Sequence, residues 1–331
     1  MPAEFTTRQY RPGDETAILE LFARSFPHAP RSLAHFEWKY RRNPFGNEHI
    51  SLTFDADGRL VGHYSGYLVP FRADGRDFLA HQIGDTMTDV SVRHIGRGPT
   101  SILGRTALHF YEHFCDGRVA FNYGFNVANI QKFSLRFLRS DRVEPVAYRV
   151  RNLRVRPLRP IPRGYRWLRG YQLELVKETT PEWDDLFARA SSAYGLTVAR
   201  NADYVRWRYL QCPDVPYVVV AIRKWQRLAG WIAYRVRDNR FAWGDALFDP
   251  ADADAIDVTL RHVVPSLGVE AIEAWFPPRP HWLDAKLTGL HFETRPEPQN
   301  LSVMCVPFAW PDVVARMHED LHFTWGDSDL F

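Results

Sequence analysis

The chain has 331 residues, of which 45% are hydrophobic and 24% charged, with a formal net charge of +3. At roughly 100–200 residues per domain, this length favours two domains of ordinary soluble composition, and the small net charge argues against a nucleic-acid-binding protein. Cys115, Cys212 and Cys305 are widely spaced and form no CxxC pair, which predicts reduced thiols and a cytoplasmic protein. No apolar run resembles a signal peptide or approaches the length of a membrane span.

Hydrophobic periodicity predicts alternating strands and helices in the first half of the chain. Asp14 should cap a helix over 15–26, whose Ile18, Leu19, Leu21 and Phe22 form an apolar face. The other predicted elements, in chain order, are strands over 6–10, 49–55, 59–71 and 79–92, a helix from near residue 100 to 110, a strand over 118–125 and a helix over 130–139. This order predicts an open mixed sheet covered by helices.

A series of landmarks occurs twice in the same order, which indicates two copies of one fold. Each copy has an aromatic-basic-Tyr phrase that ends in Pro, then a glycine inside an apolar run, then a G-D-x-x-x-D pattern. The first copy has WKYRRNP at Trp38–Pro44, Gly62, and the pattern at Gly84, Asp85 and Asp89; the second has WRYLQCP at Trp207–Pro213, Gly230, and the pattern at Gly244, Asp245 and Asp249. The phrase reads either as a packed turn entering the sheet or as the lining of an acceptor pocket.

The join between the copies falls in RVRNLRVRPLRPIPRGYRWLRGY, residues 149–171, which is rich in arginine and proline. We interpret it as a strand followed by a linker, and a phosphate- or acid-binding surface is the alternative. The predicted domains are therefore an N-terminal domain over 1–150, a basic strand and linker over 151–172, and a C-terminal domain over 173–331.

A glycine-rich turn follows the GDTMTD strand of the first copy. Gly96 and Gly98 flank Arg97, and a helix is expected to begin near Thr100. Glycines let the backbone approach an anion, and the amides at a helix N-terminus donate hydrogen bonds to it. Because the turn lies between a strand and a helix, it predicts a phosphate-binding loop.

This loop resembles the acetyl-CoA motif of the GNAT (Gcn5-related N-acetyltransferase) superfamily. RQYRPGDETAILELF, WKYRRNP, RLVGHYSGY and NYGFNVAN extend the resemblance over roughly residues 5–150, and AKLTGLHF in the second half resembles the same family. The resemblance implies an α/β (α+β) fold class with two tandem GNAT folds. Each would have a mixed, mostly antiparallel central sheet flanked by helices, and the second copy would be degenerate.

The family motif R/Q-x-x-G-x-G/A fits the loop in two registers. One places it literally on Arg93, Gly96 and Gly98; the other ends at Thr100 and puts Ile95 where the family has Arg or Gln. The resemblance implies that acetyl-CoA or another acyl-CoA is the donor, with no metal. The cofactor-binding residues that it implies are Met87, Thr88, Val90, Ile95, Gly96, Arg97, Gly98, Thr100, Asn126 and Asn129.

The second copy lacks this loop. Asp252, Asp254 and Asp257 occupy the corresponding stretch, which has no glycine. Carboxylates there would repel a pyrophosphate, and side chains would keep the backbone away from it. We therefore expect the two copies to share a fold but not a ligand.

The resemblance also implies direct transfer of the acyl group to an amine, which a base assists by accepting the amine's proton. Asp85, on the strand before the loop, is the first candidate for the base. It also recurs in the copy without a loop, so a role in the fold is the alternative. His63 and His81 are weaker candidates. The family often uses Tyr as the acid, but the helix over 130–139 has none, which leaves Tyr123, Ser134 or Tyr148.

The resemblance therefore implies an N-acyltransferase, most simply an N-acetyltransferase, that acts on a primary amine of a small molecule or sugar. The alternatives are a Fem-like aminoacyl transferase that uses aminoacyl-tRNA and a non-catalytic GNAT-fold binding protein. Two phrases, His109–His113 and His318–His322, have zinc-like spacing, but amphipathicity explains the first and the second lacks a downstream ligand. No nucleic acid, metal or membrane span is expected, and the oligomeric state is open.

Overall fold

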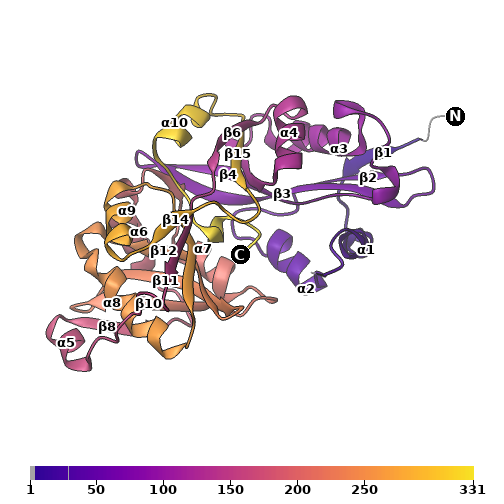
Figure 1. The fold of residues 1–331 in the computed structure, drawn as a ribbon. Helices are drawn as coiled ribbons and strands as arrows, with labels where there is room; N and C mark the ends of the chain where they lie inside the picture. The colour runs from indigo at the N-terminus through magenta and orange to yellow at the C-terminus, as the bar shows by residue number, and fades with distance from the viewer. Residues whose placement is uncertain (1–3, 29) are drawn as a thin grey trace. The chain divides into compact units, whose positions relative to one another are not determined.

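The structure is a computed structural model that describes residues 4–28 and 30–331. Its chain divides into two compact units (Figure 1). Unit 1 comprises residues 1–70, 78–145 and 299–318; unit 2 comprises residues 71–77, 146–298 and 319–331. Each unit therefore contains segments from both halves of the sequence, and the domain boundaries expected near residues 150 and 172 stay predictions.

Unit 1 has a sheet in the order β1-β2-β3-β4-β5-β15-β6. Its strands are β1 (Thr6–Gln9), β2 (Ile50–Phe54), β3 (Leu60–Ala73), β4 (Arg76–Thr88), β5 (Phe121–Asn126), β6 (Asp141–Pro145) and β15 (Ser302–Pro307). Its helices are α1 (Glu15–Ser25), α2 (Leu33–Phe36), α3 (Ile102–Phe110), α4 (Ala128–Phe137) and, at its end, α10 (Val313–Asp320).

Unit 2 has a sheet in the order β8-β10-β11-β12-β13-β7-β14. Its strands are β7 (Tyr148–Asn152), β8 (Tyr171–Leu175), β10 (Val218–Lys224), β11 (Arg227–Arg237), β12 (Arg240–Phe248), β13 (Ala271–Trp275) and β14 (Glu293–Arg295), with a short pair formed by β9 (Leu196–Val198) and β16 (Leu321–His322). Its helices are α5 (Arg163–Leu168), α6 (Glu182–Ala190), α7 (Ala202–Val205), α8 (Asp254–Val263) and α9 (His281–Gly289).

The two sheets match strand for strand, and each takes its sixth strand from the other half of the sequence. β15, from the second half, lies between β5 and β6, with Cys305 opposite Tyr123. β7, from the first half, lies between β13 and β14, with Ala274 opposite Arg149. Each sheet is mostly antiparallel, with one parallel pair in the middle, β4–β5 and β12–β13. The fold class expected from the sequence, two tandem folds of mixed sheet and helices, is confirmed.

Local expectations for unit 1 hold with two corrections. Helix α1 buries Ile18, Leu21 and Phe22, as its periodicity predicts. The Asp14 side chain, however, does not cap α1, because it accepts hydrogen bonds from the Arg8 guanidinium and the Arg11 amide instead. The strand expected over 79–92 was also wrong at its end: β4 stops at Thr88, and the chain turns into a short 3₁₀ segment over Val90–Val92.

The aromatic-basic-Tyr phrases lie at equivalent places. In each unit a one-turn helix, α2 or α7, runs directly into a π-helical turn, Glu37–Arg41 or Arg206–Leu210. π-Helical turns are rare and are frequently found at functional sites. Both turns bury the aromatic, the basic residue and the tyrosine, as expected for a packed turn, and the lining of an acceptor pocket stays the alternative.

Candidate functional site

The middle of the unit 1 sheet opens where β4 and β5 separate. These parallel strands pair only through His81 with Asn122 and Gln82 with Tyr123. Beyond that point β4 continues to Thr88 and β5 to Asn126 with no ladder between them. The opening leaves backbone groups of both strands without a strand partner, which lets an extended ligand lie between them.

The glycine loop follows β4 and closes onto the start of α3. Gly96 and Gly98 have positive φ values of 72° and 54°, a backbone conformation that side chains rarely adopt. A Cβ at Gly104 would lie 2.1 Å from the Gly98 carbonyl oxygen, so this third glycine lets the loop pack directly on the helix. Ser101 caps α3 by accepting a hydrogen bond from the Gly104 amide. Three glycines thus bring loop backbone to a helix N-terminus, as anion binding requires.

The other residues implied by the family motif differ in which of their groups a bound anion could contact. Arg97 is exposed at the loop, so its guanidinium can reach an anion. Ile95 instead packs its side chain against Val61, Val92 and Ile102, and its amide donates to the Val92 carbonyl. Ile95 therefore offers a bound anion neither its side chain nor its amide.

At the end of β4, Met87 is buried in the core formed with α1, so only its backbone can contact a ligand. The exposed Arg93 donates to the Thr88 carbonyl oxygen at 3.0 Å, and Val90 is 75% exposed. On the loop itself, the Arg97 amide donates to the Thr100 hydroxyl at 3.2 Å, and that hydroxyl donates to the Arg97 carbonyl oxygen at 3.0 Å. The hydroxyl of Thr100 thus stabilises the loop internally.

The corner between β5 and α4 carries the remaining predicted residues. Asn126 ends β5, and its carbonyl oxygen accepts a hydrogen bond from Gln131 at 2.6 Å. Asn129 is exposed in the first turn of α4. Tyr123 is buried at the last paired position before the strands separate, and Ser134 is buried on α4. Tyr123 thus lies beside the strand opening, whereas Ser134 lies further along the helix.

Asp85 is held in a buried ion pair on β4. Its carboxylate accepts hydrogen bonds from the Lys39 ammonium at 2.7 Å and from the Tyr40 hydroxyl at 2.8 Å, and its φ is 49°. Burial alone would raise the pKa of the Asp85 carboxyl, but the Lys39 charge and hydrogen bond outweigh it and hold that pKa below its ordinary value. A carboxylate held ionised in this way is a weak proton acceptor.

His63 lies beside Asp85 but is a neutral imidazole rather than an ion-paired carboxylate. Its Nδ1 atom is 2.7 Å from the Asp85 carbonyl oxygen and must donate to it, which makes Nε2 the atom with the free lone pair. The side chain is 1% exposed, and Nε2 has no hydrogen-bond partner among the described residues. Burial lowers the pKa of His63 to about 4, so the imidazole is neutral at pH 7 and its Nε2 lone pair is available, although the lowered pKa also makes it a weak base.

The second aspartate of each G-D-x-x-x-D pattern serves the fold. Asp89 accepts from the Ser91 amide and pairs with Arg24, while Asp249 accepts from the Ala251 amide and pairs with Arg189. Arg59 and Arg227 pair with these two aspartates in the same way. The recurrence of this aspartate therefore reflects an identical strand-end turn in both units.

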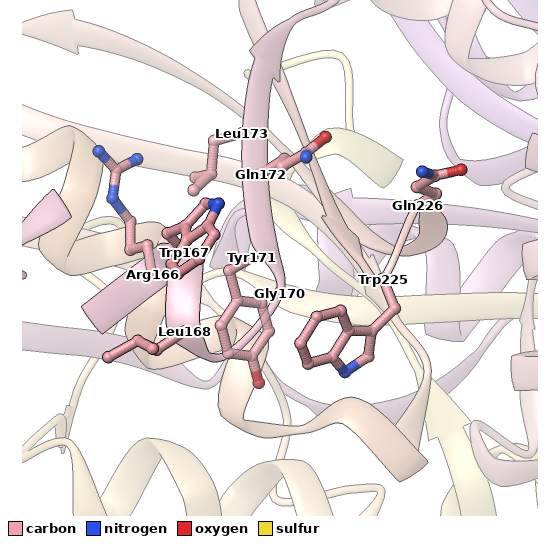
Figure 2. Close-up of a pocket in the computed structure, with 9 residues that line it drawn as sticks. All are labelled: Arg166, Trp167, Leu168, Gly170, Tyr171, Gln172, Leu173, Trp225 and Gln226. Carbon is pink, nitrogen blue, oxygen red and sulfur yellow. The ribbon is translucent and has the colours of Figure 1, made fainter. Parts of the chain in front are cut away.

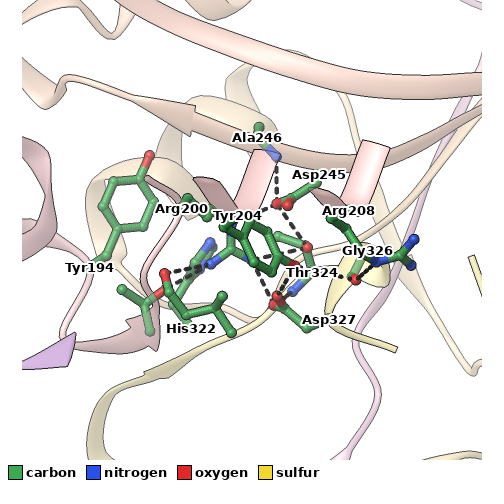
Figure 3. A network of polar contacts seen from close by, with 12 residues as sticks. Tyr194, Arg200, Tyr204, Arg208, Asp245, Ala246, His322, Thr324, Gly326 and Asp327 are labelled. Atoms are coloured by element: carbon green, nitrogen blue, oxygen red, sulfur yellow. Dashed lines mark hydrogen bonds and ion pairs between the residues drawn. The ribbon is translucent and has the colours of Figure 1, made fainter. Parts of the chain in front are cut away.

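The first aspartate has different surroundings in unit 2. Asp245 is fully buried and accepts from the Tyr209 hydroxyl at 2.6 Å, as Asp85 does from Tyr40. It also binds Arg200 at 2.7 Å and the Thr324 hydroxyl at 2.9 Å (Figure 3). The Arg200 guanidinium bridges Asp245 to Asp327, 2.6 Å away. A closed network therefore occupies the place where unit 1 has Asp85 and His63.

The strand opening of unit 2 is filled by the chain itself. β12 and β13 pair from Arg240 to Trp243 only. A Cβ at Gly244 would lie 1.9 Å from the Phe331 ring, and Trp325 stacks on Trp275 with ring centroids 5.2 Å apart. Aromatic side chains from the segment after β16 thus occupy the space between the separated strands.

The loop position of unit 2 is also closed. Asp252 is 5% exposed and forms ion pairs with Lys224 and Arg227. Asp254 pairs with Lys286 at 2.7 Å, and the turn over Pro250–Asp252 contains no glycine. The carboxylates expected to exclude a pyrophosphate are therefore present and are part of a local ion-pair network.

The two phrases with zinc-like spacing have other partners. His109 contacts the Ser51 hydroxyl at 2.8 Å, and His113 donates to the His109 carbonyl oxygen. His322 donates to the Arg279 carbonyl oxygen. Within residues 4–28 and 30–331, no group of three His, Cys, Asp or Glu side chains is arranged to hold a metal. Over the same ranges, no helix is long and apolar enough to cross a membrane.

A surface pocket of about 880 Å³ lies at the β8 edge of unit 2 (Figure 2). Trp167 and Leu168 come from α5, Tyr171 from β8, and Trp225 from the β10–β11 turn. Trp167 and Trp225 are 77% and 69% exposed. None of the residues predicted for CoA binding or proton transfer lines this pocket, whereas the basic 149–171 segment contributes Arg166, Trp167, Leu168, Gly170 and Tyr171 to it.

Sequence reasoning missed Lys39 and Arg200 as partners of the two aspartates. Both aspartates were noticed because they recur, but neither partner could be inferred from that pattern. Lys39 is 46 residues from Asp85, and Arg200 is 45 residues from Asp245. Lys39 lies within the first repeated phrase, whereas Arg200 lies seven residues before the second phrase and no sequence feature pointed to it.

Comparison with known proteins agrees with this geometry. Residues 6–134 match the family described as the acetyltransferase (GNAT) domain, and this match covers most of the region in which the sequence resembles that superfamily. No curated protein matches the chain in sequence.

Solved structures resemble the chain over nearly its whole length. A GCN5-related N-acetyltransferase from Anabaena variabilis ATCC 29413 has a TM-score of 0.67 at 10% identity, over 91% of this chain and 72% of that one. A GCN5-related N-acetyltransferase from Kribbella flavida has a TM-score of 0.65 at 13% identity, over 94% and 72%. The N-myristoyltransferase of Saccharomyces cerevisiae, solved with bound myristoyl-CoA, has a TM-score of 0.57 at 10% identity, over 92% and 79%. At these identities the likeness shows the fold.

Proposed function

We propose that the protein is an acyl-CoA-dependent N-acyltransferase, in the first place an N-acetyltransferase, whose donor site lies in unit 1. The observation that carries the proposal is the glycine loop of Gly96 and Gly98, packed on the capped start of α3 next to the opening between β4 and β5. The match of residues 6–134 to the acetyltransferase domain supports it.

In this proposal the loop amides and Arg97 bind the pyrophosphate of CoA. The pantetheine arm lies in the strand opening against the backbone of Met87, Thr88 and Val90. Asn126 and Asn129, at the β5–α4 corner, contact the arm from the other strand. Thr100 and Ile95 contribute by shaping the loop, because their polar groups are engaged within it.

The reaction is direct attack of the amine nitrogen on the thioester carbon. A C–N bond forms, the C–S bond breaks, the amine loses a proton, and the thiolate leaves as CoA and is protonated. We propose His63 Nε2 as the acceptor of the amine's proton, because its lone pair has no partner and Asp85 fixes its tautomer. The earlier candidate, Asp85, would then orient His63 rather than accept the proton itself.

Protonation of the thiolate has a weaker structural basis. Tyr123, at the start of the strand opening, is the candidate acid, and Ser134 is the alternative from α4. Both remain proposals, and replacing each with Phe or Ala, respectively, would show which one slows release of CoA.

We further propose that the second copy is degenerate and binds no CoA. Its loop position carries paired aspartates, and its strand opening holds Phe331 and Trp325. One chain would therefore bind one CoA. The acceptor is a small-molecule amine, and a cytoplasmic location and the absence of nucleic-acid partners remain proposals.

The test is ligand-dependent melting of the full chain with CoA, acetyl-CoA and bulk tRNA. A rise in melting temperature with CoA but not with tRNA supports the proposal, because a ligand that binds only the folded state stabilises it. A rise with tRNA alone would identify a Fem-like aminoacyl transferase. CoA binding without turnover of any amine would identify a non-catalytic binding protein.

A further inference from the structure

We propose that the acceptor carries a carboxylate as well as an amine, as an amino acid does, and that Arg31 binds this carboxylate. The inference rests on the proposed function, since it names the class of acceptor for the same site. It is carried by a comparison between an arginine of unit 1 and its counterpart in unit 2.

Arg31 and Arg200 occupy the same position in the two copies. Each directly precedes the residue that caps the one-turn helix: Ser32 accepts from the amide of His35, and Asn201 accepts from the amide of Tyr204. Each also lies seven residues before the tryptophan of the repeated phrase. The fold therefore delivers an arginine to the same side of the G-D strand in both units.

In unit 2 this arginine binds a carboxylate supplied by the chain. Arg200 donates to Asp327 at 2.6 Å while it also holds Asp245 on the strand. Arg208, the basic residue of the repeated phrase, donates to the carbonyl oxygens of Gly326 and Ser328 at 3.1 Å and 3.0 Å. The segment 324–328 is thus bound over β12 as a peptide ligand would be, with its carboxylate on the arginine (Figure 3).

In unit 1 the arginine has no such partner among the described residues. Its Nε atom is buried and makes no hydrogen bond. The Arg31 guanidinium lies 5.6 Å from the centre of the Phe22 ring, which restricts where it can point. It is close enough to Asp85 to lower the pKa of that carboxyl. A buried N–H donor without an acceptor is uncommon in folded proteins, and a carboxylate is the preferred partner of a guanidinium.

The arrangement suits a ligand with both an amine and a carboxylate. Asp85 is already neutralised by Lys39 at 2.7 Å, so Arg31 supplies the positive charge for an incoming anion. His63 Nε2, the proposed proton acceptor, is next to Asp85 as well. An α-amino acid would place its carboxylate toward Arg31 and its amine toward His63, with Asp85 between the two side chains.

The experiment compares amino acids with their carboxamides, which differ at one group only. Acetylation of a panel of L-amino acids and the matching L-amino acid amides is measured with acetyl-CoA. We expect kcat/KM to be about tenfold or more higher for the acids, as for a charge-assisted bidentate contact. In Arg31→Met this preference should fall to near unity, and Arg31→Lys should restore part of it.

Two controls separate this inference from the proposed function. CoA affinity, measured by calorimetry, should be unchanged in Arg31→Met; absence of CoA binding in the wild type would instead remove the proposed function. The matched variant Asp327→Asn, at the unit 2 position, should leave the preference intact. Equal kcat/KM for acids and amides in the wild type, or an unchanged preference in a folded Arg31→Met, would overturn the inference.

If no acceptor of the panel is turned over, binding gives the answer. N-acetylated amino acids and N-acetylated amino acid amides are titrated into the CoA-bound protein and followed by melting temperature. A larger rise with the acids that Arg31→Met removes supports the carboxylate site, and equal rises would contradict it.

Discussion

The two units have the same strand order and the same tyrosine–aspartate contact, yet they surround it differently. In unit 1 Asp85 pairs with Lys39 and holds His63, whose Nε2 lacks a partner among the described residues. In unit 2 the position after Gly230 that corresponds to His63 is Trp231, and Asp245 belongs to a closed network with Arg200. A contact found in both units belongs to the fold, and the groups found in one unit alone are the better candidates for chemistry.

The largest expected effect concerns His63. His63→Gln should lower turnover by about 10²–10⁴-fold, because the variant removes the proton acceptor, and the loss should shrink at high pH where more amine is neutral. CoA affinity should be kept. Steady-state kinetics from pH 7 to 10 with calorimetry of CoA binding would measure both.

Asp85→Asn and Asp245→Asn are the matched pair for this prediction. If His63 is the base, both should cost about 1–3 kcal/mol of stability, as for a disturbed buried hydrogen bond, and Asp85→Asn should slow turnover less than His63→Gln. A greater loss in Asp85→Asn than in His63→Gln would return the role of base to Asp85.

The next effect concerns the arginines. Arg200→Met should destabilise the protein by about 3–5 kcal/mol, because it leaves Asp245 and Asp327 buried without their shared cation. Arg31→Met should cost about 1 kcal/mol or less, since Arg31 is only partly buried and joins no such network. Denaturant unfolding of both variants tests this, and equal losses would show that the arginine has one structural role in both units.

A smaller effect concerns the loop. Gly98→Asp should weaken CoA binding by about tenfold or more, or about 1.4 kcal/mol, because it places a carboxylate where the pyrophosphate is expected. Calorimetry should give one CoA per chain in the wild type. Two equivalent sites would contradict the closure of unit 2.

Two glycine controls isolate the charge in that experiment. A Cβ at Gly98 lies 2.7 Å from the Phe137 ring and φ is 54°, so Gly98→Ala reports the cost of that contact and of the backbone strain without the charge. Gly117 has φ 71° and open space around it, so Gly117→Asp adds the same charge and strain away from the loop. Gly117→Asp should leave CoA affinity unchanged, and a loss equal to that in Gly98→Asp would remove the loop from the proposal.

The last expected effect is a difference in acid sensitivity between the two units. Burial lowers the pKa of His49 and His63 to about 4 and of His81 to about 3 in unit 1, and of His322 to about 3 in unit 2. Each is neutral when folded and takes up a proton near pH 6.5 when unfolded. Its stabilising contribution is therefore full above pH 6.5 and is lost as the pH falls toward 4 or 3.

From pH 7 to 5.5 this loss is about 1 kcal/mol for each histidine. Asp327 in unit 2 acts in the opposite direction, because burial raises the pKa of its carboxyl. Unit 1 should therefore lose more protection than unit 2 in hydrogen exchange, once intrinsic rates are corrected for pH. Equal losses of hydrogen-exchange protection in the two units would contradict this use of the histidine and Asp327 pKa shifts.

The sequence by itself determined the order of elements, the duplication and the glycine loop. These depend on periodicity within a dozen residues and on the positive φ that Gly96 and Gly98 adopt. Both are local properties, so they can be read along the chain. The aspartates that replace the glycines in the second copy predicted the difference between the units for the same reason.

Only the tertiary structure decided which residues surround the two aspartates. β7 and β15 each pair with strands from the other half of the sequence, and Arg200 reaches Asp327 across 127 residues. No local pattern specifies such contacts, because chain closure over these distances depends on the whole packed fold. The sequence could not show that Arg200 has a carboxylate partner, Asp327, which Arg31 lacks among the described residues, because folding brings these distant segments together.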